Sequence, residues 1–159
     1  LNDYKKDSKK IINQLKELSN KYPNNNFLLI HMGQVEFSEA KLILSSTKNI
    51  HFITSHADNE VENRIKSMTK VSSQTGFINL FERDDSLQQK WVDLMNAHPK
   101  RFVLALDRVF AGSWLKYKEK IHLWRKALAK LDETTAGLIA CGNANEYFKL
   151  GIECLSERP

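Results

Sequence analysis

The apolar residues of this chain form two kinds of pattern, which alternate along its length. In residues 4–22, apolar side chains recur three and four positions apart, as on a helix with one buried face. Residues 27–31 (FLLIH) instead form a continuous apolar run, which is typical of a strand buried on both faces of a parallel sheet. This alternation predicts helices that pack against parallel strands.

The same alternation continues to the end of the chain. Further strands are predicted at residues 49–56, 76–82 and 101–107, and helices at 38–46, 59–70, 86–97, 115–131, 134–140 and 144–150. Four strands that alternate with helices predict a single α/β unit spanning residues 1–159. Doubly wound sheets and (β/α)8 barrels both fit this order. The six glycines form neither GxGxxG nor GxxxxGK[ST], which argues against the common nucleotide-binding folds.

Composition places the chain among globular proteins. Hydrophobic residues make up 42% and charged residues 27% of the 159 residues, which is too apolar for a disordered chain and enough for one core. We find no apolar run of the roughly 18 residues that a membrane span needs, and no signal-peptide pattern. These features predict a cytoplasmic protein without a membrane partner.

Charge and cysteine content add two expectations. The net charge is +5, and many lysines lie near the N-terminus, but acidic residues interleave with them and no aromatic platform accompanies them. We therefore expect a solvated helix face and no nucleic-acid partner. Cys141 and Cys154 are isolated in the sequence, and two cysteines are too few for a disulfide scaffold, so we expect a reducing compartment.

Each predicted strand ends on a residue that can bind a metal or move a proton. The strands end, in order, on His31, His56, Glu82 and Asp107. Ligands of parallel α/β folds bind at the carboxyl ends of the strands, so these side chains would meet. Two imidazoles and a carboxylate suit a divalent transition metal such as zinc, and a carboxylate beside water activated by a metal can act as a general base.

Each of these residues also has a structural alternative. His31 and His56 could be half-buried strand-end histidines, and Asp107 could cap a helix. Glu82 is followed by three charged residues, so a solvated loop is the favoured interpretation there. His51 should point to the opposite face of its strand from His56 and serve packing.

The remaining histidines and a helical stripe receive no chemical role. His98 precedes a proline at the amino end of the last strand, and His122 lies within the long helix. An apolar stripe at helical spacing is predicted to be core, and it comprises Trp114, Tyr117, Ile121, Trp124 and Leu128.

Several segments, in order, resemble the amidohydrolase-related metal-dependent hydrolases, the class that includes aminocarboxymuconate semialdehyde decarboxylase and lactone hydrolases. Residues 27–33 (FLLIHMG) resemble the fifth strand of that family's barrel, and residues 50–57 (IHFITSHA) the sixth. Residues 98–110 (HPKRFVLALDRVF) resemble the eighth strand. The helix with Trp124-Arg125 and the segments GLIA and GNA are similar to the family's C-terminal helices. The resemblance implies the C-terminal portion of a (β/α)8 TIM barrel, with strands five to eight and the terminal helices.

The resemblance also implies roles for individual residues. His31 would be a metal ligand, and His56 a ligand of a second metal or the histidine that polarises the substrate carbonyl. Asp107 would be a metal ligand and the general base, so that His56 and Asp107 form the catalytic pair. The metal would be zinc, with manganese as the alternative, and no organic cofactor is implied. Asn143 would tie the terminal helices together.

Two departures from the family define the competing hypotheses. The family's first strand supplies a His-x-His pair, which this chain lacks, and Leu106 stands where a small residue often precedes the aspartate. Because a whole barrel needs about 250 residues, we expect part of a larger enzyme, inactive alone, whose open edges favour a homo-oligomer.

The main hypothesis is a metal-dependent hydrolase or non-oxidative decarboxylase that acts on a small-molecule lactone, amide or ester. The alternative is a non-catalytic α/β module that has lost the metal site. A flavodoxin-like binding domain is a third, weaker hypothesis.

Overall fold

The computed structural model describes residues 2–57, 78–107 and 114–154, with side chains from Lys9 onward. The fold is mixed α/β, as the sequence predicts. Its elements in chain order are α1 (Asn2–Lys21), β1 (Phe27–Leu29), the short 3-10 helix η1 (Ile30–Gln34), α2 (Phe37–Ser46), β2 (Ile50–Ile53), α4 (Gln89–Ala97), η2 (Pro99–Arg101), β3 (Phe102–Val103), α6 (Tyr117–Leu128), α7 (Glu133–Gly137), η3 (Leu138–Gly142) and α8 (Asn143–Phe148).

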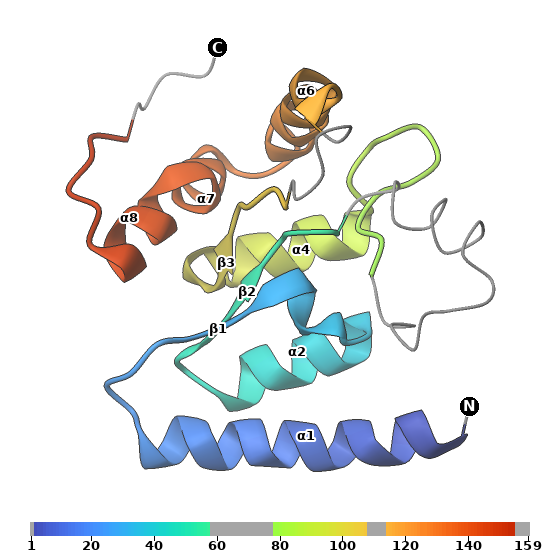
Figure 1. Cartoon of the computed structure of the whole chain (residues 1–159), viewed down its shortest axis with the longest axis vertical. Helices are drawn as coiled ribbons and strands as arrows, with labels where there is room; N and C mark the ends of the chain where they lie inside the picture. Colours follow the sequence, from blue (N-terminus) through green and yellow to red (C-terminus); the bar gives the residue numbers. More distant parts are fainter. Residues whose placement is uncertain (1, 58–77, 108–113, 155–159) are drawn as a thin grey trace.

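The three strands form one parallel sheet in the order β1-β2-β3. Phe27 pairs with Ile50, and Phe52 pairs with Phe102. In Figure 1, α1 and α2 lie below the sheet, whereas α6, α7 and α8 lie above it. Because all three strands run the same way, their carboxyl ends meet at one edge of the sheet.

The predicted strand at 76–82 is wrong over its described residues. Residues 78–80 form no strand, and Phe81 makes only a single antiparallel bridge to Leu87. The Asn79 side chain explains this, because its amide nitrogen donates to the Phe81 carbonyl and its oxygen accepts from the Phe81 N–H. The segment therefore folds back on itself, and β2 pairs directly with β3. The predicted helix at 59–70 lies outside the described residues.

Packing of β2 against β3 is fixed by aromatic rings and by a buried cation. The Phe52 and Phe102 rings stack with their centroids 5.9 Å apart. The buried Arg101 guanidinium donates to the carbonyls of Ile50 and Thr47, at 2.7 and 2.8 Å. These bonds tie the start of β3 to β2 and to the end of α2. They also satisfy the guanidinium group, because an unpaired cation in the interior would be strongly destabilising.

Asn143 anchors the C-terminal helices to the sheet. Its side chain is fully buried, and its amide nitrogen donates to the carbonyls of Pro99 and Phe102 at 2.8 and 2.7 Å. The sequence indicates a structural role for Asn143, but the interpretation that it joins the terminal helices to one another needs correction. These bonds run from the start of α8 to the start of β3, so Asn143 positions the strand that leads to Asp107.

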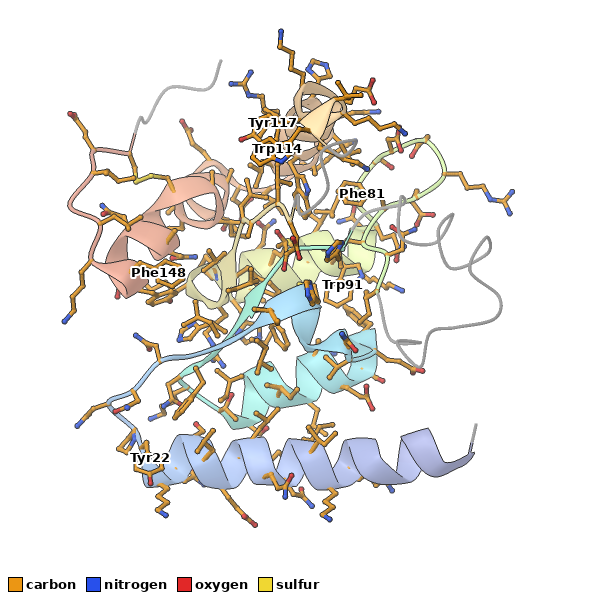
Figure 2. The ribbon with its side chains drawn as sticks, in the orientation of Figure 1. Tyr22, Phe81, Trp91, Trp114, Tyr117 and Phe148 are labelled. Carbon is orange, nitrogen blue, oxygen red and sulfur yellow. A yellow bond between two sulfur atoms is a disulfide. The ribbon has the colours of Figure 1, made fainter. Side chains whose placement is uncertain are left out.

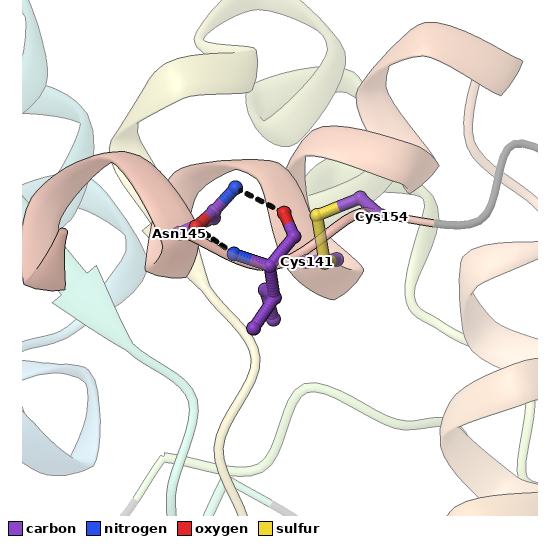
Figure 3. Close-up of a disulfide and its surroundings, with 4 residues drawn as sticks. Cys141, Asn145 and Cys154 are labelled. Carbon is purple, nitrogen blue, oxygen red and sulfur yellow. Dashed lines mark hydrogen bonds between the residues drawn. A yellow bond between two sulfur atoms is a disulfide. The ribbon is translucent and has the colours of Figure 1, made fainter. Parts of the chain in front are cut away.

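The two cysteines are paired, contrary to the sequence-based expectation that they are isolated. Cys141 and Cys154 form a disulfide that links η3 to the segment after α8 (Figure 3). Asn145 closes the same loop, because its side chain donates to the Ile152 carbonyl and accepts from the Ile152 N–H. The prediction failed because the chain reverses direction at Lys149 and Gly151, which both adopt left-handed φ angles near +60°.

The helical stripe along α6 is only partly core. Trp124 is buried, as predicted, but Trp114 is 58% exposed and Tyr117 is also exposed. The two exposed residues are the first two of the stripe, and they lie outside the apolar core. Figure 2 shows Trp114 and Tyr117 together at the start of α6.

Candidate metal centre

His56 and Asp107 are brought together by the register of β2 and β3. Beyond the regular strands, the Thr54 side chain continues the pairing, because its hydroxyl accepts from the Ala105 N–H at 3.1 Å and lies 3.3 Å from the Ala105 carbonyl. His56 and Asp107 each follow these paired residues by two positions. Their side chains therefore emerge next to each other, with His56 Nε2 2.9 Å from Asp107 Oδ2.

His31 reaches the same place from the end of β1. The predicted strand at 27–31 ends early, at Leu29, and residues 31–34 all adopt left-handed φ angles between 52° and 64°. At Gly33 a Cβ atom would lie 3.1 Å from Leu29 Cδ1, so only glycine fits there without a shift. This turn directs the His31 ring towards the ends of the two neighbouring strands.

Both histidines have strained backbone, as do four other described residues, Met32, Gln34, Asp85 and Lys149. His31 has φ 54° and His56 has φ 56°, a region that costs a residue with a Cβ roughly 1–2 kcal/mol. The fully buried Met32 holds the strained turn in place from the core. Strain retained at two polar residues on neighbouring strand ends is a recurring feature of functional sites.

The three predicted ligands converge in space. His31 Nε2 lies 4.0 Å from Asp107 Oδ2, and one candidate donor atom from each of the three residues falls within 4.8 Å of the others. Donor atoms around tetrahedral zinc lie about 3.3 Å apart, given bonds of about 2.0–2.1 Å. The observed separations bracket this value, so small side-chain rotations would complete the geometry.

Ser55 fixes the orientation of the His31 ring. Its carbonyl oxygen and its hydroxyl lie 3.3 and 3.1 Å from His31 Nδ1, and its hydroxyl accepts from the His31 N–H at 3.2 Å. In metalloproteins, a histidine that donates from Nδ1 to a carbonyl commonly binds the metal through Nε2. Nε2 is the atom that faces Asp107.

The donor set and its exposure fit a divalent metal. Two imidazole nitrogens and one carboxylate match the ligands of catalytic zinc sites, which keep one position open for water or substrate. The three side chains are 18% to 29% exposed, so the site is accessible from solvent without being a surface pair. Manganese is also compatible with this set, because it accepts carboxylate and imidazole ligands.

The other candidate residues lie elsewhere. Glu82 is exposed in the turn after Phe81, which agrees with the loop interpretation. His51 is buried on the far side of β2, as predicted, with Nδ1 3.2 Å from the Lys100 carbonyl. Burial, followed by the nearby Arg101 charge, lowers the pKa of His51 to about 4. His98 ends α4 and His122 lies exposed in α6, both away from the three ligands.

Sequence reasoning missed two features of the site. One is Ser55, for which the only available signal was its position next to His56 at a strand end. The other is a pocket of about 400 Å³ beside the strand that carries Asp107, lined by Leu104, Ala105, Leu106, Trp114, Tyr117 and Ile121. Its aromatic walls belong to the stripe that the sequence assigned to the core.

Comparison of the chain with protein-family models, with curated proteins and with solved structures found no match. Within the described residues, no helix has the length and apolar character to cross a membrane.

Proposed function

We propose that this chain carries the metal centre of a hydrolase that cleaves a small-molecule ester, lactone or amide, or of a related non-oxidative decarboxylase. The observation that supports the proposal is the convergence of His31, His56 and Asp107 from the ends of three parallel strands. His31 and His56 would hold zinc, or manganese, together with Asp107. The amidohydrolase-like barrel expected from the sequence belongs to the same proposal.

When bound, such a metal polarises a carbonyl and lowers the pKa of water towards 7. Asp107 would accept the proton of the attacking water through a carboxylate oxygen. His56 Nε2 lies 2.9 Å from Asp107 Oδ2, which would let both atoms bind the same metal ion. His31, held through Nδ1 by Ser55, would keep its Nε2 directed into the site.

The alternative is a module that binds metal weakly or not at all and has no turnover. The lack of a His-x-His pair favours it, since a two-metal site would need further ligands. Three protein ligands nevertheless suffice for a single catalytic zinc. Metal binding and turnover together separate the two proposals.

The decisive experiment measures zinc and manganese binding to the purified chain by calorimetry and elemental analysis. We expect one metal per chain, and at least about 100-fold weaker binding in Asp107→Asn, which exceeds the effect typical of outer-shell changes. His122→Gln, an exposed histidine outside the site, is the matched control. Equal zinc affinity in wild type and Asp107→Asn would refute the metal centre.

Turnover is measured in parallel on a panel of aryl esters, lactones and amides, with the same variants. Absence of zinc and manganese binding, together with no turnover of any of these substrates, would favour the non-catalytic alternative, whereas stoichiometric, tight metal binding would argue against it.

The cytoplasmic location expected from the sequence remains part of this proposal, and the disulfide tests it. Disulfides such as Cys141–Cys154 are rare in the cytosol. Thiol counting on protein isolated under alkylating conditions should find two free thiols if the protein resides there.

A further inference from the structure

The pocket of about 400 Å³ lies beside the residues that lead to the candidate metal centre, so it could receive part of a substrate bound there. Its floor, Leu104 to Leu106, is the stretch of chain directly before Asp107. Ala105 is the residue paired with Thr54, two positions before His56. Two residues of extended chain span about 7 Å, so a group bound at the ligands needs only a short extension to enter the pocket.

Among the described residues, the six side chains that line the pocket are aliphatic or aromatic, and none of these six carries a charge. The rings of Trp114 and Tyr117 lie 5.5 Å apart and are inclined by 32°, so they form one continuous aromatic wall (Figure 2). A charged group would lose its hydration here without gaining a charged partner among these six side chains.

The size and exposure of the pocket also indicate its occupant. A volume of about 400 Å³ falls in the range of small-molecule sites. Trp114 is 58% exposed. Large aromatic side chains contribute most to stability and binding when other groups cover them. A flat ring placed against Trp114 would bury apolar surface that the chain itself leaves open.

We infer that this pocket binds an uncharged, apolar ring of the substrate, so that the metal centre acts on esters, lactones or amides that carry an aromatic or alicyclic group next to the scissile bond. The inference rests on the proposed function, because it names the substrate class of the same site.

The test uses two hydroxamates that share one metal-binding group and differ only in the ring. Benzohydroxamate and acetohydroxamate are titrated calorimetrically into the zinc-loaded chain. Burial of a phenyl group predicts about 10- to 100-fold tighter binding of benzohydroxamate. Trp114→Ala should reduce this ratio to below about threefold with zinc affinity unchanged, because Trp114 is not among the ligands.

Leu115→Ala is the matched control, since Leu115 is the next residue, is 88% exposed and does not line the pocket. It should leave the ratio unchanged. Equal affinities for the two hydroxamates in the wild-type chain that has bound zinc would overturn the inference and leave the metal centre intact.

A second arm separates failure of the pocket from failure of the proposed function. Binding of 4-methylphenol to the metal-free chain is followed by the NMR signal of the Trp114 indole N–H, assigned with Trp114→Ala. A saturable shift supports the ring pocket even where zinc does not bind. The absence of any shift, together with equal hydroxamate affinities or no zinc binding, overturns the inference.

Discussion

Replacement of Asn143 by alanine should destabilise the whole fold, although Asn143 is not one of the three candidate metal ligands. Asn143 is fully buried, and its amide nitrogen donates to the carbonyls of Pro99 and Phe102. Both carbonyls belong to the segment that starts β3. The substitution therefore removes one buried and one partly buried hydrogen bond at once, and it leaves both carbonyl acceptors without this donor.

The magnitude follows from these contacts. Each neutral hydrogen bond contributes about 1 kcal/mol, and an unsatisfied buried acceptor adds about 1–3 kcal/mol. The side-chain oxygen of Asn143 is buried without a hydrogen-bond partner, which destabilises the folded state. Its removal therefore offsets part of the loss of stability. We expect a net decrease of about 2–3 kcal/mol in the free energy of unfolding, out of the roughly 5–15 kcal/mol typical of a domain.

Urea unfolding followed by circular dichroism measures the change. Asn20→Ala, which truncates an exposed asparagine in α1, is the control and should change stability by less than about 0.5 kcal/mol. A loss below about 1 kcal/mol in Asn143→Ala would refute the argument that these two bonds hold β3. Because β3 leads to Asp107, the variant should also bind zinc more weakly at temperatures where it stays folded.

Three further predictions concern other parts of the chain. The pKa of His51 falls from 6.5 to about 4 on folding, so its contribution to the free energy of unfolding is fully present above pH 6.5. This contribution, at most about 3 kcal/mol, is lost as the pH falls towards 4. His51→Gln should remove this part of the pH dependence in urea titrations. Ser55→Ala should weaken zinc binding about 10-fold by calorimetry, because it removes the hydroxyl from His31 but keeps the carbonyl contact. Cys154→Ser should lower the free energy of unfolding by about 2–3 kcal/mol, as expected for a disulfide across 13 positions, and an unchanged urea midpoint would contradict this.

The positions of His31, His56 and Asp107 also explain why the sequence could predict that these three residues meet. His31, His56 and Asp107 each follow an apolar run, and parallel strands end at the same edge of their sheet. The sequence therefore placed the three residues together without knowledge of their contacts. What it did not predict is how His31 gets there, because the strand ends at Leu29 and a left-handed turn supplies the remaining path.

By itself, the sequence determined the elements whose signals are local. The periodicity of residues 4–22, 38–46 and 86–97 corresponds to α1, α2 and α4, because a helix face is set by neighbours three and four positions away. The apolar runs likewise located β1, β2 and β3, although each strand is shorter than predicted.

Only the tertiary structure decided the features that depend on residues far apart in the chain. Residues 78–80 do not form the predicted strand, because β2 pairs with β3 and Asn79 closes a local turn. Cys141 meets Cys154 because of a chain reversal between them, and Trp114 stays exposed because α6 begins beyond the core. In each case the outcome depends on which partners compete for the same surface, and that competition is not visible in local sequence patterns.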